Sequence, residues 1–243
     1  MNTSTPNQLR EVLSTDNVRL IDEDIYSVLP DDSSEHHYDR RASIYDLVVS
    51  THLYNFVMWG SSPRDYANFG SQAINFLAEG ILLDAPCGSL LFTAPAYLQS
   101  HRQIVAIDQS VAMLKRARKR LVELAGSMPS NVTLLQADLS DLPFRPGSFR
   151  TVLCMNVLHL FQDAAGLISS LNILLTNEGC LFLTSLVSSN RFIGDAYLRA
   201  LYLTKEFVRP RSRSELEKII NDSGTREVSL SVKGNMAFVI GKS

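Results

Sequence analysis

Short apolar runs alternate with longer amphipathic or polar stretches along the chain from residue 80 onward. Five such runs, ILLDA, QIVAID, VTLLQAD, RTVLCMNV and GCLFLTSL, begin near residues 81, 103, 132, 150 and 179. Strand-length runs separated by helix-length segments are typical of parallel pairing, because a parallel neighbour needs a crossover connection. The pattern therefore predicts an α/β fold built on a Rossmann-like, doubly wound sheet.

The clearest helix and the clearest hairpin support this fold. Residues 111–125 carry one apolar stripe at helical spacing, with Ser110 placed to cap the start and Gly126 the end. Near the C-terminus, REVSLSV and MAFVIGK flank the turn residues KGN, which predicts two antiparallel strands. Together with the five runs, this hairpin predicts a seven-stranded sheet that is mostly parallel.

The segments outside the alternating pattern predict an arm and two lids. The first 35 residues are polar and acidic, with Asp22, Glu23 and Asp24 in succession, and we expect a mobile or loosely docked arm. Apolar and aromatic residues recur at helical spacing on both sides of the turn-forming GSSP at 60–63, which predicts two helices. We divide the chain into an acidic arm (1–35), a helical lid segment (36–80) and a Rossmann-like core (81–243) with a lid insert (187–211).

Charge, cysteine content and the lengths of the apolar stretches limit the kinds of partner and environment that we expect. The chain of 243 residues has a formal net charge of -2, which gives no overall positive field for nucleic acid. Cys87, Cys154 and Cys180 each lie in an apolar stretch, so we expect buried thiols rather than a disulfide framework or a metal site. No apolar stretch of membrane-spanning length and no basic-then-apolar leader occurs, so we expect a cytoplasmic monomer or homodimer acting on a small molecule.

Three successive apolar runs end in an aspartate. Asp84 precedes the small-residue turn Ala85-Pro86-Cys87-Gly88-Ser89, Asp108 ends the second run and Asp138 the third. In a doubly wound sheet, ligands bind beyond the carboxyl ends of the strands, where strand order reverses. The carboxylates could cap turns, or they could bind the ammonium, ribose and adenine groups of an adenosine-containing cofactor.

The sequence of the turn after the first run, residues 85–89, distinguishes between classes of cofactor. Dinucleotide-binding enzymes need three glycines there as G-x-G-x-x-G, so that the backbone approaches a pyrophosphate. This chain has Pro86, Gly88 and Leu90 near those positions. A cofactor without phosphates fits the turn better, and an NAD-linked oxidoreductase stays as an alternative.

At this point the motifs resemble a known family. The segments LLDAPCGSLLFTA, VAIDQSVAMLKRAR, LLQADLSDLPFRPGSFRTVLCMNVLH and NEGCLFLTSL are similar, in order and separation, to the motifs of class I S-adenosylmethionine-dependent methyltransferases. The resemblance implies that Asp84 to Ser89 contact the methionine and sulfonium end, Asp108 the ribose, Asp138 and Leu139 the adenine, and Asn156 the far wall. The full expected set for S-adenosylmethionine, or its product S-adenosylhomocysteine, is Tyr38, Asp84, Ala85, Pro86, Cys87, Gly88, Ser89, Asp108, Gln109, Met113, Asp138, Leu139 and Asn156.

A narrower resemblance concerns the segment before the core. Tyr38-Asp39, Ala42, Tyr45-Asp46 and Trp59, with the ending VKGNMAFVIGK, are similar to the ubiquinone and menaquinone C-methyltransferases. A related small-metabolite methyltransferase is an equal alternative. Tyr45 and Trp59 of the lid segment, with Arg191 and Tyr197 of the insert, are the expected substrate contacts, although the aromatic residues also suit a packed core.

His159 follows the fourth run, where the reacting groups meet in such a sheet. Imidazole accepts a proton near neutral pH, so His159 is the candidate general base, with a structural role as the alternative. We expect no metal. The predicted function is methyl transfer from S-adenosylmethionine to a small-molecule acceptor, with a cofactor-binding module that does not turn over as a further alternative.

Overall fold

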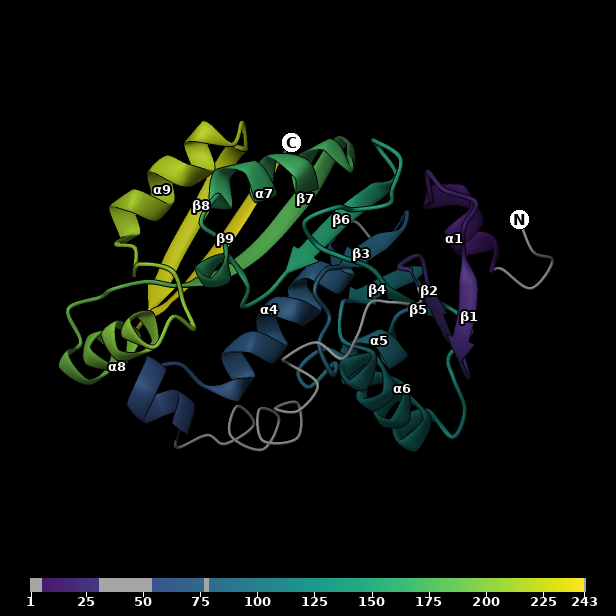
Figure 1. Ribbon diagram of the computed structural model, residues 1–243, viewed down its shortest axis with the longest axis horizontal. Helices are drawn as coiled ribbons and strands as arrows, with labels where there is room; N and C mark the ends of the chain where they lie inside the picture. The colour runs from purple at the N-terminus through teal and green to yellow at the C-terminus, as the bar shows by residue number, and fades with distance from the viewer. Residues whose placement is uncertain (1–5, 31–53, 77–78, 243) are drawn as a thin grey trace.

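The computed structural model describes residues 6–30, 54–76 and 79–242, and its centre is one sheet (Figure 1). Nine strands lie in the order β1-β2-β5-β4-β3-β6-β7-β9-β8. Their bounds are β1 (Arg19–Asp22), β2 (Ile25–Ser27), β3 (Leu82–Asp84), β4 (Ile104–Asp108), β5 (Val132–Gln136), β6 (Phe149–Cys154), β7 (Leu175–Leu186), β8 (Arg226–Lys233) and β9 (Met236–Lys242). The five predicted runs form the parallel strands β3 to β7, and strand order reverses at β3, which pairs with β4 on one side and β6 on the other.

Helices cover both faces of the sheet (Figure 1). One face packs against α1, α7 and α9 in a large apolar cluster, and the other packs against α4, α5 and α6. The helix bounds are α1 (Asn7–Val12), α4 (Pro63–Asn75), α5 (Ala94–Gln99), α6 (Val111–Ala125), α7 (Ala164–Ile173), α8 (Phe192–Leu203) and α9 (Arg213–Asp222), with a π-helical turn η1 (Asn55–Trp59) and a 3-10 turn η2 (Leu158–Leu160). This three-layered α/β arrangement confirms the predicted fold class.

The C-terminal hairpin has the predicted antiparallel pairing, and its turn is also a packing element. β9 pairs antiparallel with both β7 and β8. At the turn, Gly234 has a φ of 61°, and a Cβ placed there would lie 2.0 Å from the Trp59 carbonyl oxygen. The next amide, of Asn235, donates to that carbonyl at 2.6 Å. The hairpin therefore holds η1 through a contact that only glycine permits.

The expected loose arm is wrong for its described part, because residues 7–27 form a helix and two strands that extend the sheet. β2 pairs parallel with β5, which raises the strand number from the seven expected to nine. The acidic cluster faces the basic side of α6, where Lys115 lies 2.7 Å from Asp22, and Arg118 contacts both Glu23 and Asp24. Exposed pairs contribute little individually, but here they complement the apolar contacts of the docked hairpin.

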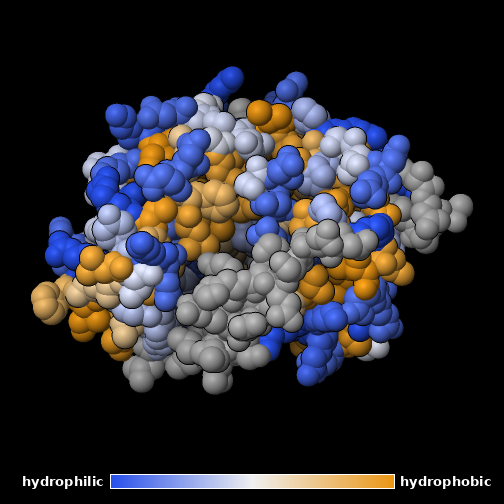
Figure 2. Space-filling model, in the orientation of Figure 1, coloured by the Kyte–Doolittle hydropathy of each residue, from blue (hydrophilic) through white to orange (hydrophobic). Residues whose placement is uncertain are grey.

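The lid segments are described only in part. The helix predicted before the turn at 60–63 lies largely outside the described residues, and its last residues form the π-helical turn η1. The second predicted helix is α4, whose Ser62–Asp65 capping box fixes its start. The insert forms α8 beside η1, and its outer face is apolar, with Phe192 87% and Leu203 78% exposed (Figure 2). Among the described helices, we find none with the length and apolar character needed to cross a bilayer.

Candidate functional site

The carboxyl ends of β3, β4 and β5 are joined by hydrogen bonds at one edge of the sheet. The Cys87 amide donates to the Ile107 carbonyl at 2.7 Å, and the Ala137 amide donates to the Asp108 carbonyl at 3.2 Å. Gln109 Nε2 lies 3.4 Å from Asp138 Oδ2. The structure thus brings the three predicted aspartates to one edge, as expected for a doubly wound sheet.

Asp108 connects the turn after β3 to the start of α6. Its Oδ2 accepts from the Gly88 amide and its Oδ1 from the Ser110 amide, both at 2.9 Å. A carboxylate oxygen accepts hydrogen bonds from backbone amides and from hydroxyl groups alike. The residue is half-buried, and this geometry fits the predicted pairing with the two hydroxyls of a ribose.

Asp84 is 2% exposed and accepts a hydrogen bond from the hydroxyl of Tyr97, with Oδ2 at 2.7 Å. Burial raises the pKa of Asp84 to about 7, with a further increase from the charge of Asp108, while the Tyr97 hydrogen bond opposes both. A cationic partner strongly stabilises the ionised form of a buried carboxylate, because its charge offsets the cost of removing the carboxylate from water. Asp84 is therefore suited to the ammonium group of a bound ligand.

The turn between β3 and α5 has two residues in the left-handed backbone region. Gly88 has a φ of 54°, and a Cβ built there would meet no atom of the described residues within 4 Å. Leu90 has a φ of 55° and is 1% exposed. A non-glycine residue in this region costs about 1–2 kcal/mol, which burial of the leucine side chain offsets. The turn therefore keeps its left-handed conformation at position 90 with leucine in place of glycine.

The residues expected to contact the adenine follow β4 and β5. Asp138 Oδ1 accepts from the amide and hydroxyl of Ser140, which fixes its side chain in a turn. Met113, in the first turn of α6, is 6% exposed, and Leu139 is 9% exposed. Both present little surface, so any contact with an adenine ring would be through an edge of the side chain or the backbone.

Asn156 lies beyond β6 on the same edge and is held by β7. Its amide donates to Thr184 Oγ1 at 2.9 Å, and its Oδ1 accepts from that hydroxyl at 3.0 Å. Its φ of 57° is one that asparagine tolerates better than most residues. The predicted wall residue is thus in a fixed position, and its side-chain Nδ2 donates no hydrogen bond among the described residues.

His159, in η2, is half-buried and lies against Phe207, with ring centroids 4.2 Å apart. Its Nδ1 is buried and has no hydrogen-bond partner among the described residues. Burial, and secondarily the Arg211 guanidinium, lower the pKa of His159 to about 3. The imidazole is therefore neutral at neutral pH and is a weak base, since a general base works best with a pKa near the working pH.

The structure brings two of the four predicted substrate residues together. Trp59, 7% exposed, and Tyr197 have ring centroids 5.3 Å apart, and Tyr54 packs edge-on against both. These rings belong to an apolar cluster that also contains Phe92, Met155 and Phe207, which border the strand ends and His159. The cluster is a packed wall next to the candidate site. Tyr38 and Tyr45 lie outside the described residues.

Arg191, the fourth predicted substrate residue, points into the protein. Its guanidinium donates to the carbonyls of Phe56, Val57 and Met58 and to Asn235 Oδ1, at 3.2 to 3.5 Å. These bonds satisfy carbonyl groups at η1 that a helical end leaves open. In this arrangement Arg191 ties the insert to the lid segment, and both of its Nη atoms donate within the protein.

Tyr97 and Arg120 are two contacts at the site that the sequence pattern did not indicate. Tyr97 lies in a short helix without any recognisable motif, and only its contact with Asp84 reveals it. Arg120 of α6 reaches back so that its Nη1 donates to the Ser89 carbonyl. Both contacts join residues more than ten positions apart in the chain, so no local spacing indicates either of them.

Comparisons with known proteins agree with this geometry. Residues 83–183 match a family model described as a methyltransferase domain. Malonyl-[acyl-carrier protein] O-methyltransferase of Legionella pneumophila is 33% identical over 111 residues, 45% of this chain and 37% of that protein. Ubiquinone biosynthesis O-methyltransferase of Xanthomonas euvesicatoria is 29% identical over 61% of this chain and 63% of its own length. The matches thus span less than two thirds of these curated relatives.

A solved structure shows the same fold at low identity. Phosphoethanolamine N-methyltransferase 2 of Haemonchus contortus, in complex with phosphomonomethylethanolamine and S-adenosylhomocysteine, superposes with a TM-score of 0.66 at 13% identity. The similarity covers 87% of this chain and 59% of that one. It shows that the two proteins share a fold, and the methyltransferase domain model matches residues 83–183 of this chain.

Proposed function

We propose that this protein transfers a methyl group from S-adenosylmethionine to a small-molecule acceptor. The observation that carries the proposal is the joined edge of β3, β4 and β5, where Asp108 accepts from the Gly88 and Ser110 amides at the place where a ribose would lie. The domain match supports the same activity. When bound, S-adenosylmethionine supplies an electrophilic methyl group on a sulfonium.

The residues at the edge divide the binding of this cofactor among them. Asp84 would meet the ammonium of the methionine part, and Asp108 the ribose hydroxyls. The backbone at Gly88 would lie along the part of the cofactor that joins its ammonium group to its ribose. Gln109, Asp138 and Leu139 would lie next to the adenine. The absence of the glycine-rich pyrophosphate turn disfavours NAD, because Pro86 provides no backbone donor there.

The wall of Phe92, Met155 and Phe207, continuous with Trp59 and Tyr197, would contain the acceptor. A methyl displacement needs the acceptor atom in line with the departing sulfur, so orientation by a rigid wall supplies much of the rate enhancement. Such a wall also excludes water from the reacting atoms. We further propose that the lid segment 36–80 and the insert 187–211 together cover this pocket.

Proton removal is a small part of the proposed reaction. With a pKa lowered to about 3, His159 is a weak base and would serve as a hydrogen-bond partner that orients the acceptor. The acceptor atom should therefore already be nucleophilic at neutral pH, as an ionised oxygen, an enolate carbon or an unprotonated amine is. The names of the relatives, which include O-methyltransferases, agree with an oxygen acceptor.

Calorimetric titration with S-adenosylhomocysteine tests the cofactor assignment. We expect Asp108→Ala to bind about 10- to 100-fold more weakly than wild type, because two charge-assisted hydrogen bonds are lost. Asp141→Ala, an exposed aspartate three residues beyond Asp138, is the control and should bind like wild type. Equal affinity of the Asp108 variant, or binding of NADH in place of S-adenosylhomocysteine, would refute the proposal.

Turnover is tested separately from binding. Release of S-adenosylhomocysteine from S-adenosylmethionine, measured across a panel of small phenols, carboxylic acids and amines, should identify at least one acceptor that raises the rate. A chain that binds the cofactor tightly yet releases none with any acceptor is the cofactor-binding module of the alternative hypothesis.

A further inference from the structure

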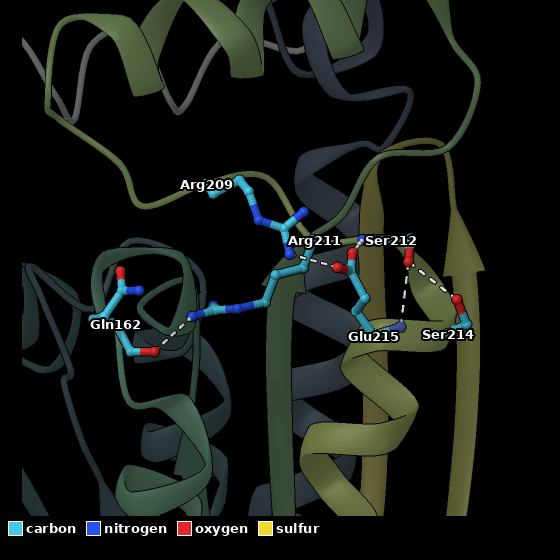
Figure 3. A network of polar contacts seen from close by, with 6 residues as sticks. All are labelled: Gln162, Arg209, Arg211, Ser212, Ser214 and Glu215. Atoms are coloured by element: carbon cyan, nitrogen blue, oxygen red, sulfur yellow. Dashed lines mark hydrogen bonds and ion pairs between the residues drawn. The ribbon is translucent and has the colours of Figure 1, made fainter.

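Two arginines face a small hollow beside the candidate site. The hollow has a volume of about 160 Å³ and is lined by Gln162, Val208, Arg209 and Arg211. In Figure 3 the Arg211 side chain extends toward Gln162, and the Arg209 guanidinium lies near the start of α9 beside Glu215. At about 30 Å³ per water molecule, the space holds roughly five waters, which is enough for one compact group and too little for a whole acceptor.

The hollow lies at the same edge of the sheet as the three aspartates. The Val208 amide donates to the His159 carbonyl at 3.0 Å, and Arg211 Nη1 donates to the Leu158 carbonyl at 2.8 Å. Both carbonyls belong to η2, which follows β6 directly. A group bound in the hollow would thus be next to His159 and the apolar wall.

Positive charge exceeds negative charge among the residues that form it. Arg209 pairs through Nη2 with Glu215 Oε1 at 2.5 Å. Arg211 donates to three carbonyl oxygens, of Leu158, Phe161 and Gln162, which are neutral and leave its charge in place. Burial lowers the pKa of Arg211, and the like charge of Arg209 lowers it further. Two guanidinium groups and one carboxylate leave an excess of one positive charge.

The donors are also held in place before any ligand arrives. The carbonyls of Leu158, Phe161 and Gln162 fix the Arg211 plane. The Ser212–Glu215 capping box at the start of α9 fixes the carboxylate that orients Arg209. A guanidinium presents five N–H groups, so each arginine keeps donors beyond those used in these contacts. Preorganised guanidinium donors are well matched to the oxygens of a carboxylate or phosphate.

We propose that this hollow is an anion subsite that binds a carboxylate or phosphate group of the methyl acceptor, placed by Arg209 and Arg211 beside His159. Its role for the acceptor rests on the proposed methyl transfer, whereas its capacity to bind an oxyanion does not. The subsite thus assigns the acceptor to the class of small acids that carry an oxyanion apart from the reacting atom.

Inorganic phosphate and acetate, titrated separately into the full chain at constant ionic strength, test the subsite. Chemical-shift changes of the arginine side-chain N–H signals report the dissociation constant, with and without saturating S-adenosylhomocysteine. The variants are Arg209→Gln and Glu215→Gln, and the matched control is Arg213→Gln. Arg213 is an exposed arginine at the start of the same helix that pairs with Glu217 at 2.8 Å.

The expected results separate a binding role from a structural one. Arg209→Gln should bind the preferred anion about five-fold or more weakly, and Arg213→Gln should bind it within about two-fold of wild type. Glu215→Gln keeps the capping box, since glutamine also serves there, and removes the competing carboxylate, so it should bind several-fold more tightly. If Arg209 only stabilised the fold, Glu215→Gln would not bind the anion more tightly than wild type does.

Several outcomes would overturn the subsite. Unchanged affinity in both Arg209→Gln and Glu215→Gln would do so, as would an equal loss in Arg213→Gln, which would indicate general screening. Shifts confined to signals around Asp84 and Gly88, and abolished by S-adenosylhomocysteine, would place the anion elsewhere. Anion binding that follows these predictions in a chain that binds no S-adenosylhomocysteine would retain the subsite and refute the methyltransferase proposal.

Discussion

The buried carboxyl of Asp84 should make the protein less stable as the pH rises, and Asp84→Asn should remove this dependence. The pKa of Asp84 is about 7 in the folded chain against 3.8 for the ordinary group. A raised folded pKa means that the folded state keeps a proton that the unfolded chain releases, so stability falls between about pH 4 and pH 7. A difference of about three pKa units at about 1.4 kcal/mol each gives a ceiling of about 4 kcal/mol.

Asparagine does not titrate, and its carbonyl oxygen still accepts the Tyr97 hydroxyl. The variant and wild type should therefore be similarly stable at pH 4.5, and by pH 7.5 the variant should be more stable by up to about 4 kcal/mol, or about 10 °C in Tm. Urea unfolding followed by circular dichroism at both pH values measures this difference. The exposed Asp141→Asn serves as the control.

The same substitution should weaken S-adenosylhomocysteine, because the amide offers no negative charge to the methionine ammonium. A gain in stability with a loss of affinity is the expected mark of a residue retained for binding. Parallel stability curves for wild type and Asp84→Asn from pH 4.5 to 7.5 would refute the argument that burial raises the pKa of this group.

Three further predictions concern the scaffold. Gly234→Ala should cost more than about 2 kcal/mol in urea unfolding, because its Cβ meets the Trp59 carbonyl, whereas Gly224→Ala, at a φ of 80° with open space around it, should cost only about 1 kcal/mol. Arg102→Met should cost about 2–4 kcal/mol, since the buried guanidinium donates to carbonyls at the end of α4 and to Thr151 Oγ1, and a normal unfolding midpoint would contradict this role. The three buried thiols should react with Ellman's reagent at pH 8 only in denaturant, as burial raises the pKa of Cys180 to about 11, and rapid labelling of the native chain would disprove it.

The sheet and the edge that carries the candidate site were predictable from the sequence, because both depend on local patterns. Apolar runs of strand length identify the five parallel strands, and parallel strands necessarily place their carboxyl ends at one edge. Asp84, Asp108 and Asp138 could therefore be brought together without knowledge of any tertiary contact. The C-terminal hairpin was predictable for the same reason, since its turn residues lie between its two strands.

Contacts between distant segments account for what the sequence left undetermined. Tyr97 reaches Asp84 from a helix that carries no motif, and nothing local distinguishes it from a core tyrosine. Arg191 looked like a substrate contact because of its place in the insert, whereas the positions of the η1 carbonyls decide where its donors go. The acidic arm gave no sign of docking, since its partner, the basic face of α6, is about 90 residues further along.

The hairpin of β1 and β2 also determines how the sheet ends. β2 occupies the hydrogen-bonding side of β5 that would otherwise be a bare border, and open borders of this kind recruit other chains into intermolecular sheets. A shortened version that starts after residue 30 would keep every residue of the proposed catalytic edge while exposing that border. We expect such a chain to self-associate during expression, because β1 and β2 would no longer cover that border.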